Sequence, residues 1–362
     1  HGDGRLRGEF IPLMIGEKNY QFIQQIKSCW DPDAIFNPKK IIHTPPMNTS
    51  LRYEAGKTHR EFDTVFDFSA NQGILRAAEQ CNGSGDCRKT ALSNGGMCPS
   101  YMASREEKDS TRARANILRE FLTNSTKTNP FNHKEIYEVM DLCLSCKACK
   151  SECPSNVDIT KLKAEFLQHY YDENGAPIRA KMIANITSFN KMGMLFPAFY
   201  NFFLKNKFTS LIFKKLLNFA PKRSIPLLYK ISLKRWYKKN IKSYSPLHPK
   251  KSVYLFVDEF TNYNDTEIGI KALKLLWKLG YNVDIPDHKQ SGRAFLSKGF
   301  LRKAQRIAQS NIGLLGGLVS ADKPLIGIEP SGILCFRDEY PDLLKGKGKE
   351  IAHKLSESSL LF

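Results

Sequence analysis

The chain has 362 residues, enough for two or three domains whose cores fold without disulfides. Apolar residues make up 41% of the sequence and charged residues 25%, which excludes a disordered tail, a collagen and a membrane channel. With 55 Lys and Arg against 36 Asp and Glu, the net charge is +19. The longest uncharged stretch in the most apolar segment, residues 192–204, is too short for a membrane-spanning helix, which needs about 20 apolar residues.

The start of the chain, His1-Gly2-Asp3-Gly4, has neither an initiating Met nor an apolar signal segment. We therefore expect a fragment of a longer cytoplasmic protein. Residues 1–45 are predicted to be the end of a domain, with a helix that stops at Asp31-Pro32 and a turn at Asn37-Pro38. The apolar face of that helix is formed by Phe22, Ile23, Ile26 and Trp30.

Residues 46–70 are predicted to be a polar linker that contains a short strand through Phe62, Phe66 and Phe68. Residues 71–175 are predicted to be mostly helical. Ser110 or Thr111 caps one helix, which buries Ile117, Leu118 and Phe121. Asp158 caps another, which carries Leu162, Phe166 and Tyr170 and ends near Gly175.

The positive charge is concentrated in one segment. Between Asn174 and Val257 the sequence has no Asp or Glu but 17 Lys and Arg, interleaved with Phe, Leu and Tyr. Residues 176–250 are therefore predicted to be a basic helical connector whose partner is anionic. We expect an anionic membrane surface, and no nucleic acid, because the segment contains no recognisable nucleic-acid-binding motif.

The last segment, residues 251–362, alternates strands and helices. Strands are predicted at 252–257, 283–285 and 325–328, and helices at 267–279 and 300–309. This order predicts a small parallel sheet with helical crossovers. The expected fold class is thus α+β, a mostly helical domain followed by a small α/β domain.

Seven of the nine cysteines lie within 73 residues, which indicates metal ligands in a reducing compartment. The strongest motif is Cys143-x2-Cys146-x2-Cys149-x3-Cys153-Pro154. This spacing is typical of bacterial iron–sulfur proteins, where the fourth cysteine binds the other of two clusters. We expect a 4Fe-4S site here, and residues 71–175 are therefore predicted to be a two-cluster, ferredoxin-like domain. Zinc is the alternative, because Cys-x2-Cys also suits zinc.

The first motif, Cys81-x5-Cys87-x10-Cys98-Pro99, is irregular. If the chain crosses over, Cys98 joins Cys143, Cys146 and Cys149, while Cys153 joins Cys81 and Cys87. Ser84 stands where a regular motif would place its second cysteine. A three-iron cluster, a ligand other than cysteine and an empty first site all stay open, as does a mere packing role for these cysteines.

Other residues near the motifs have simpler explanations. Cys29 and Cys335 are interpreted as buried small apolar residues. Three arginines follow the first motif on a predicted helix, where they either form a solvated face or offset the negative charge of a cluster. These are Arg112, Arg114 and Arg119.

With these residues in place, nearly the whole chain resembles bacterial fusion proteins that join an FAD-linked oxidase to an iron–sulfur half like the glycolate oxidase iron–sulfur subunit. The family includes D-lactate and D-2-hydroxyglutarate dehydrogenases. The resemblance rests on seven stretches of sequence. They are His1–Gly4, Phe36-Asn37-Pro38, Cys81–Tyr101 with Ser110-Thr111-Arg112, Asp258-Glu259-Phe260 with Ser291-Gly292-Arg293, and Glu329-Pro330-Ser331.

The resemblance implies a function. A D-2-hydroxy acid (D-lactate, D-2-hydroxyglutarate or glycolate) would be oxidised at FAD, with His1 at the substrate as base or as neighbour of a metal. Electrons would then leave through 4Fe-4S to a quinone or a carrier, in a protein that is cytoplasmic or peripheral at the inner face of the cell membrane. Since the FAD-binding residues are missing, the fragment alone is expected to be inactive.

The chain departs from the family in one place. The cysteine-rich domain usually carries Cys where this chain has Ser291 and Gly332, so a third metal or redox site is not expected, and the domain is expected to be truncated after Phe362. One alternative is a stand-alone electron-transfer subunit of a heterodisulfide reductase-like complex. A nucleic-acid enzyme with a cluster is a further alternative.

Overall fold

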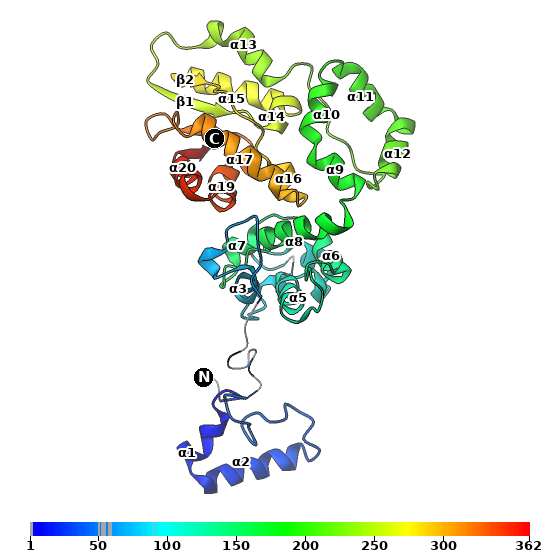
Figure 1. The fold of residues 1–362 in the computed structure, drawn as a ribbon, viewed down its shortest axis with the longest axis vertical. Helices are drawn as coiled ribbons and strands as arrows, with labels where there is room; N and C mark the ends of the chain where they lie inside the picture. Colours follow the sequence, from blue (N-terminus) through cyan, green and yellow to red (C-terminus); the bar gives the residue numbers. More distant parts are fainter. Residues whose placement is uncertain (1–2, 50, 52–55, 57–59, 91) are drawn as a thin grey trace. The chain divides into compact units, whose positions relative to one another are not determined.

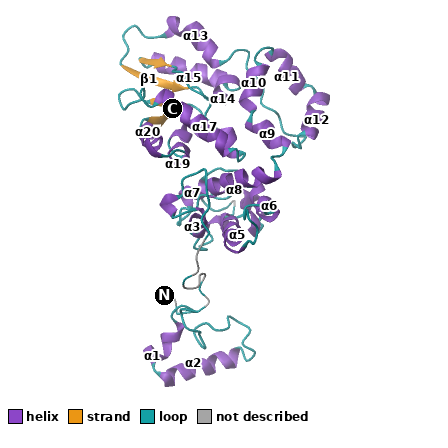
Figure 2. Cartoon of the chain, in the orientation of Figure 1, coloured by secondary structure: helices purple, strands orange, loops and turns teal. Residues whose placement is uncertain are grey.

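The computed structural model describes residues 3–49, 51, 56, 60–90 and 92–362. Figure 1 shows two compact units, residues 1–59 and residues 60–362. Figure 2 shows that helices and loops dominate, and among the described residues the strands lie in the C-terminal part. A mostly helical chain with a small sheet confirms the α+β class, while the ferredoxin-like arrangement stays a prediction.

The described residues of the first unit include two α-helices, α1 (Ile11–Ile15) and α2 (Glu17–Trp30). α2 ends as predicted, because the carboxylate of Asp31 accepts hydrogen bonds from the backbone N–H groups of Ile35 and Phe36, both at 3.0 Å. The interpretation of Cys29 as buried is wrong: this thiol is exposed. Three of the four residues of the predicted apolar face, Phe22, Ile26 and Trp30, are exposed as well.

The second unit begins with a helical region. Its helices are α3 (Ile74–Glu79), α4 (Pro99–Ser104), α5 (Thr111–Asn124), α6 (Lys134–Asp141), α7 (Ala148–Glu152) and α8 (Ile159–Asn174). Both predicted caps are present, since Ser110 accepts from Ala113 N–H and Asp158 from Lys161 N–H. Leu118 is fully buried, whereas Ile117 and Phe121 are half-buried.

The strand predicted through Phe62, Phe66 and Phe68 is not formed. The segment is held by a side chain instead of a neighbouring strand. The buried carboxylate of Glu165 accepts hydrogen bonds from Val65 N–H (2.8 Å) and Phe66 N–H (3.0 Å). Because one carboxylate satisfies both backbone groups, the segment needs no sheet.

The basic connector is helical as predicted. It contains α9 (Ile178–Ala184), α10 (Ile186–Gly193), α11 (Pro197–Lys205), α12 (Lys207–Leu216) and α13 (Leu233–Tyr244). α9 and α10 pack against the helices of the C-terminal part, while α11 and α12 pack mainly on each other. In Figure 1 these two helices lie at the outer edge of the second unit.

The C-terminal part contains a four-stranded parallel sheet in the order β2-β1-β3-β4. Its strands are β1 (Lys251–Phe256), β2 (Tyr281–Asp284), β3 (Leu325–Gly327) and β4 (Ser359–Leu361). Its helices are α14 (Glu259–Tyr263), α15 (Thr266–Lys278), α16 (Arg293–Ser297), α17 (Leu301–Leu315), α18 (Pro330–Ile333), α19 (Glu339–Leu343) and α20 (Gly346–Glu357). The predicted parallel sheet is confirmed, with β4 as an additional strand.

The two faces of β1 belong to different cores. Val253 and Leu255 pack with α13 and α15, whereas Phe256 packs with the other core. The core that contains Phe256 extends into the helical region, where it includes Leu118 of α5 and Phe166 of α8. The C-terminal part is therefore packed directly on the cysteine-bearing region.

Candidate functional site

Four of the predicted ligands surround one pocket. Cys98, Cys143, Cys146 and Cys149 line a small, partly open pocket in the second unit. Three come from the loop between α6 and α7 and the start of α7, and the fourth directly precedes α4. This grouping is the one that the crossover of the two motifs predicts.

The backbone around these thiols has an unusual conformation. Ser145 and Lys147 have φ values of 55° and 65°, and Cys98 has a φ of 60°. Such left-handed conformations are costly for residues other than glycine, so they persist only where the surroundings enforce them, often at functional sites. The chain thus turns sharply at Cys98 and again between Cys143 and Cys149, where the thiols line one pocket.

Buried cations and donors surround the same thiols. Nη1 of Arg114, a residue only 1% exposed, lies 3.7 Å from Cys98 Sγ, and Thr111 Oγ1 also lies 3.7 Å from it. The buried Lys163 donates to the carbonyl of Cys143 at 2.8 Å. Burial lowers the pKa of Lys163 to about 8. These groups favour negative charge in the pocket.

The thiols themselves are set in apolar surroundings. Burial raises the pKa of Cys149 to about 12 and also raises the pKa of Cys87. Because metal ligands must be thiolates, loading this site would release protons. The nearby cations partly offset the cost of burying that charge.

A single metal ion would need a tighter group. Within the described ranges, no three Cys, His, Asp or Glu side chains are placed to hold one ion. Zinc bonds each sulfur at about 2.3 Å, so its thiolates lie close together. In a four-iron cluster each thiolate binds a different iron, so four thiols placed around a pocket are a suitable ligand set.

The cysteines of the first motif lie along α5. Arg112 N–H lies 3.4 Å from Cys87 Sγ, and Asn116 Nδ2 lies 3.9 Å from Cys81 Sγ. Ser84 is exposed, and its N–H donates to Asn82. Cys153 follows the end of α7, where its N–H donates to the carbonyl of Cys149. A second site made by Cys81, Cys87 and Cys153 stays a prediction.

Of the three arginines considered from the sequence, Arg114 is the one whose side chain contacts a thiol. Arg112 pairs with Glu107 at 2.8 Å, and Arg119 lies 3.5 Å from Glu120. Arg112 contributes its backbone N–H to Cys87. The charge-offset explanation therefore suits Arg114, whereas Arg119 is half-buried and pairs with Glu120.

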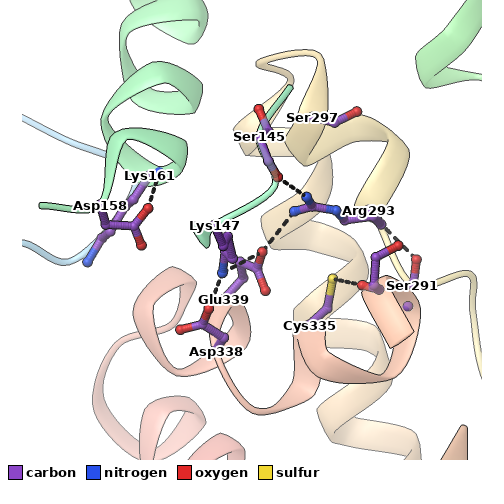
Figure 3. A network of polar contacts seen from close by, with 12 residues as sticks. Ser145, Lys147, Asp158, Lys161, Ser291, Arg293, Ser297, Cys335, Asp338 and Glu339 are labelled. Carbon is purple, nitrogen blue, oxygen red and sulfur yellow. Dashed lines mark hydrogen bonds and ion pairs between the residues drawn. The ribbon is translucent and has the colours of Figure 1, made fainter. Parts of the chain in front are cut away.

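Sequence reasoning missed a polar clamp on the Cys143–Cys149 loop (Figure 3). Arg293 donates to the carbonyl of Ser145 at 2.9 Å and to Glu339 at 3.0 Å. Lys147 pairs with Glu339 at 2.9 Å and with Asp338. Burial lowers the pKa of Lys147, but the two carboxylates outweigh it and the net shift is upward. A charged residue between two cysteines was the one local indication of this clamp.

A second polar cluster lies beyond the carboxyl ends of β1 and β3. Ser291 donates its N–H and its hydroxyl to the buried Glu259, at 2.9 and 2.7 Å, and Gly332 donates its N–H to Glu329. Burial raises the pKa of Glu259. The two positions where the family carries Cys are thus bonded to carboxylates.

Cys335 lies beside this cluster. Its thiol is buried and donates to the carbonyl of Ser331 at 3.0 Å. Burial raises its pKa well above the usual value, so it is a poor nucleophile. The interpretation of Cys335 as a small buried residue is confirmed. His1, the predicted site residue that is not a cysteine, lies outside the described residues.

Two family matches fall on the segments singled out above. Residues 80–158 match the 4Fe-4S dicluster domain, and residues 1–41 match the C-terminal domain of FAD linked oxidases. The first match contains all seven clustered cysteines and the second begins at His1. The matches confirm the resemblance to an FAD-linked oxidase joined to an iron–sulfur half, and they support 4Fe-4S and FAD as cofactors.

Over most of its length the chain is similar to D-2-hydroxyglutarate dehydrogenases. It is 26% identical to that of Escherichia coli (strain K12) over 384 residues, 94% of this chain and 37% of the relative. It is also 26% identical to the enzyme of Pantoea ananatis (strain AJ13355), over 95% of this chain and 37% of the relative. The chain therefore spans little more than a third of the length of these relatives.

A shorter similarity involves one subunit of the anaerobic glycerol-3-phosphate dehydrogenase of Escherichia coli (strain K12). The two chains are 27% identical over 130 residues, 35% of this chain and 32% of the relative. No solved structure gives a significant match.

Proposed function

We propose that this chain is the iron–sulfur electron-transfer half of an FAD-dependent D-2-hydroxy acid dehydrogenase. The observation that carries the proposal is the pocket shared by Cys98, Cys143, Cys146 and Cys149. The match of residues 1–41 to FAD linked oxidases supports a flavin partner in the same protein. D-2-hydroxyglutarate, D-lactate and glycolate are the candidate substrates, of which similarity favours the first.

The residues of the chain have distinct parts in this proposal. The four cysteines would hold a 4Fe-4S cluster, which when bound supplies one-electron transfer between a flavin and an external acceptor. Arg114 and Lys163 supply positive charge beside it. Arg293, Glu339 and Asp338 hold the loop that carries three of the ligands.

The second cluster is proposed at Cys81, Cys87 and Cys153, with a fourth ligand other than cysteine or with three irons. The match to a dicluster domain supports it. The acceptor is proposed to be a quinone or a protein carrier. No helix among the described residues is long and apolar enough to cross a membrane.

A stand-alone electron-transfer subunit is the second candidate. The similarity to a chain of anaerobic glycerol-3-phosphate dehydrogenase favours it, because that relative is a separate subunit by name. The match of residues 1–41 to the FAD linked oxidases favours the fused form. The codons upstream of residue 1 decide between the two, since the fused form requires an FAD domain there.

Metal content tests the cluster. The chain purified without oxygen should be brown and contain about four irons per molecule at the Cys143 motif, and more if the first site fills. Cys146→Ser should remove the iron and the colour that this site contributes. Cys29→Ser, at an exposed cysteine outside both motifs, should leave the iron content unchanged. Stoichiometric zinc without iron would refute the proposal.

Substrate oxidation tests the rest. A longer protein that includes the upstream sequence should reduce an artificial dye with D-2-hydroxyglutarate or D-lactate. The 362-residue chain alone should keep its iron but neither bind FAD nor oxidise these acids. An FAD-containing longer protein that oxidises none of the D-2-hydroxy acids would contradict the assigned substrate class.

A further inference from the structure

Two neighbouring helices of the connector expose large apolar side chains. On α11, Phe199, Phe202 and Phe203 are exposed at 65%, 60% and 44%. On α12, Phe208, Leu211 and Ile212 are exposed in the same way, and Leu216 continues the row at 78%. We call residues 196–216 the apolar patch. Soluble proteins rarely expose this many neighbouring apolar residues without a binding role.

The spacing shows that these residues form faces. Phe199, Phe202 and Phe203 stand at positions i, i+3 and i+4, and Phe208, Leu211 and Ile212 repeat that spacing. In a globular helix such a face points into the core. Here both faces meet solvent, because α11 and α12 pack mainly on each other at the edge of the unit (Figure 1).

Basic residues surround the patch without acidic ones. Lys205, Lys207 and Lys215 are exposed within it, and Lys191 and Lys222 are exposed on either side. The sequence has no Asp or Glu from residue 174 to residue 257. The patch thus combines exposed aromatic and aliphatic groups with unopposed positive charge.

We propose that α11 and α12 dock this protein on an anionic lipid membrane. Interfacial helices bury Phe and Leu at the acyl boundary while Lys contacts the headgroups, which is the combination found here. A second copy of the chain fits less well, because it would bring lysines against lysines with no carboxylate to pair them. The proposal rests on the exposed helices and is independent of the proposed redox function.

Vesicle flotation of the 362-residue chain tests the docking. The protein should float with vesicles of phosphatidylcholine mixed with phosphatidylserine at low salt, and much less with phosphatidylcholine alone. Added salt should release it, because salt screens charges beyond roughly 10 Å at 0.1 M. Equal recovery on both lipids, or no flotation on either, would overturn the proposal.

Matched variants locate the contact. Phe199→Ser with Phe202→Ser should weaken binding by about tenfold or more, since burial of apolar area drives insertion. Ile268→Ser with Leu275→Ser changes two exposed apolar residues of α15 and should have no effect. Iron content and the circular dichroism of each variant show whether it is folded.

The charge has its own pair of variants. Lys207→Gln with Lys215→Gln should weaken binding to anionic vesicles by about fivefold per lysine. Lys347→Gln with Lys354→Gln removes two exposed lysines of α20 and should change binding little. Equal losses in both pairs would show that net charge, and not the patch, attracts the protein, which contradicts the assignment.

Two other partners could cover the apolar patch, and each predicts a different outcome of these experiments. If a second copy covers the patch, the chain sediments as a dimer that Phe199→Ser with Phe202→Ser dissociates, and vesicles do not bind it. If the remainder of a longer protein covers the patch, the 362-residue chain floats and the longer protein does not. Either result would replace the membrane as the partner.

Discussion

Arg114 is the residue with the most unusual position. Its guanidinium is almost completely buried, yet it lies beside a thiol and donates to Ser100 at 2.9 Å and to the carbonyl of Val139 at 2.9 Å. Asp109 lies 3.6 Å from Nη2. A buried cation is costly unless nearby groups compensate it. Negative charge in the cysteine pocket would complete that compensation.

We expect Arg114→Leu to lower the reduction potential of the cluster by on the order of tens of millivolts. A reduced cluster carries one more negative charge, which the arginine stabilises. A redox titration followed by absorbance measures the shift. Arg114→Lys keeps the positive charge and should shift the potential much less. Arg119→Gln, on the same helix but paired with Glu120, should not shift it. A shift in the latter as large as in Arg114→Leu would contradict this reasoning.

His288 makes stability dependent on pH. Burial, assisted by Lys234, lowers its pKa to about 4, and its Nε2 accepts from Val257 N–H at 3.2 Å. The fold therefore favours the neutral ring, whose ordinary pKa is about 6.5. The stabilisation is complete above pH 6.5 and is lost as the pH falls towards 4, because the unfolded chain binds the proton more readily.

We expect the unfolding free energy to fall by between about 1 and 2 kcal/mol from pH 7 to pH 5 on account of this residue. His288→Gln can still accept from Val257 but does not titrate, so its unfolding midpoint should fall less over the same range. Midpoints at the two pH values, for both proteins, give the comparison. Parallel falls in the two proteins would show that other groups cause the pH dependence.

At the level of elements, local residues made several predictions possible. Ser110 and Asp158 fix helix starts through contacts within three residues, so the sequence was sufficient there. The strand prediction through Phe66 failed because the partner, Glu165, lies 99 residues away. β4 has only three residues, Ser359–Leu361, and its place beside β3 depends on pairing that no local pattern shows.

In the candidate site, too, the local features were predictable from the sequence and the long-range contacts were not. The spacing from Cys143 to Cys149 was sufficient to predict that three thiols lie around one pocket, and the Cys98-Pro99 pair suggested the fourth. The clamp could not be predicted, because Lys147 meets Asp338 across 191 residues. Contacts of this range depend on how the α/β part packs on the helical region.

Loosening the clamp should weaken the hold on the cluster. We expect Arg293→Leu with Asp338→Asn to lose iron to a chelator about tenfold faster or more, since groups that support ligands typically matter on this scale. Arg302→Leu removes a bidentate pair with Asp172, at 2.7 and 2.8 Å, that also joins α17 to α8 but lies away from the loop. It should leave the rate unchanged, and a matching increase there would mean that general destabilisation is the cause.

At the scale of the whole molecule, the cysteine-bearing region and the α/β part share one core, which includes Leu118 and Phe256. The C-terminal part therefore supports the Cys143–Cys149 loop. It does so although it has Ser291 and Gly332 at the two positions where the family usually carries Cys. In the proposed function, electron transfer belongs to residues 60–362. Substrate chemistry belongs to an FAD-linked oxidase part, whose C-terminal domain residues 1–41 match.

Two variants of a longer, FAD-containing protein should separate these two sides. His1→Ala should slow reduction of the flavin by substrate by about a hundredfold or more, the usual scale for a general base. Cys146→Ser should leave that step intact and stop electron exit, because the cysteine lies in the pocket on the other unit. Stopped-flow absorbance of the flavin under anaerobic conditions measures the first step, and steady-state turnover with a large acceptor measures the second. If His1→Ala leaves flavin reduction as fast as before, the role of His1 is wrong, while the assignment of the cysteines stands on Cys146→Ser alone.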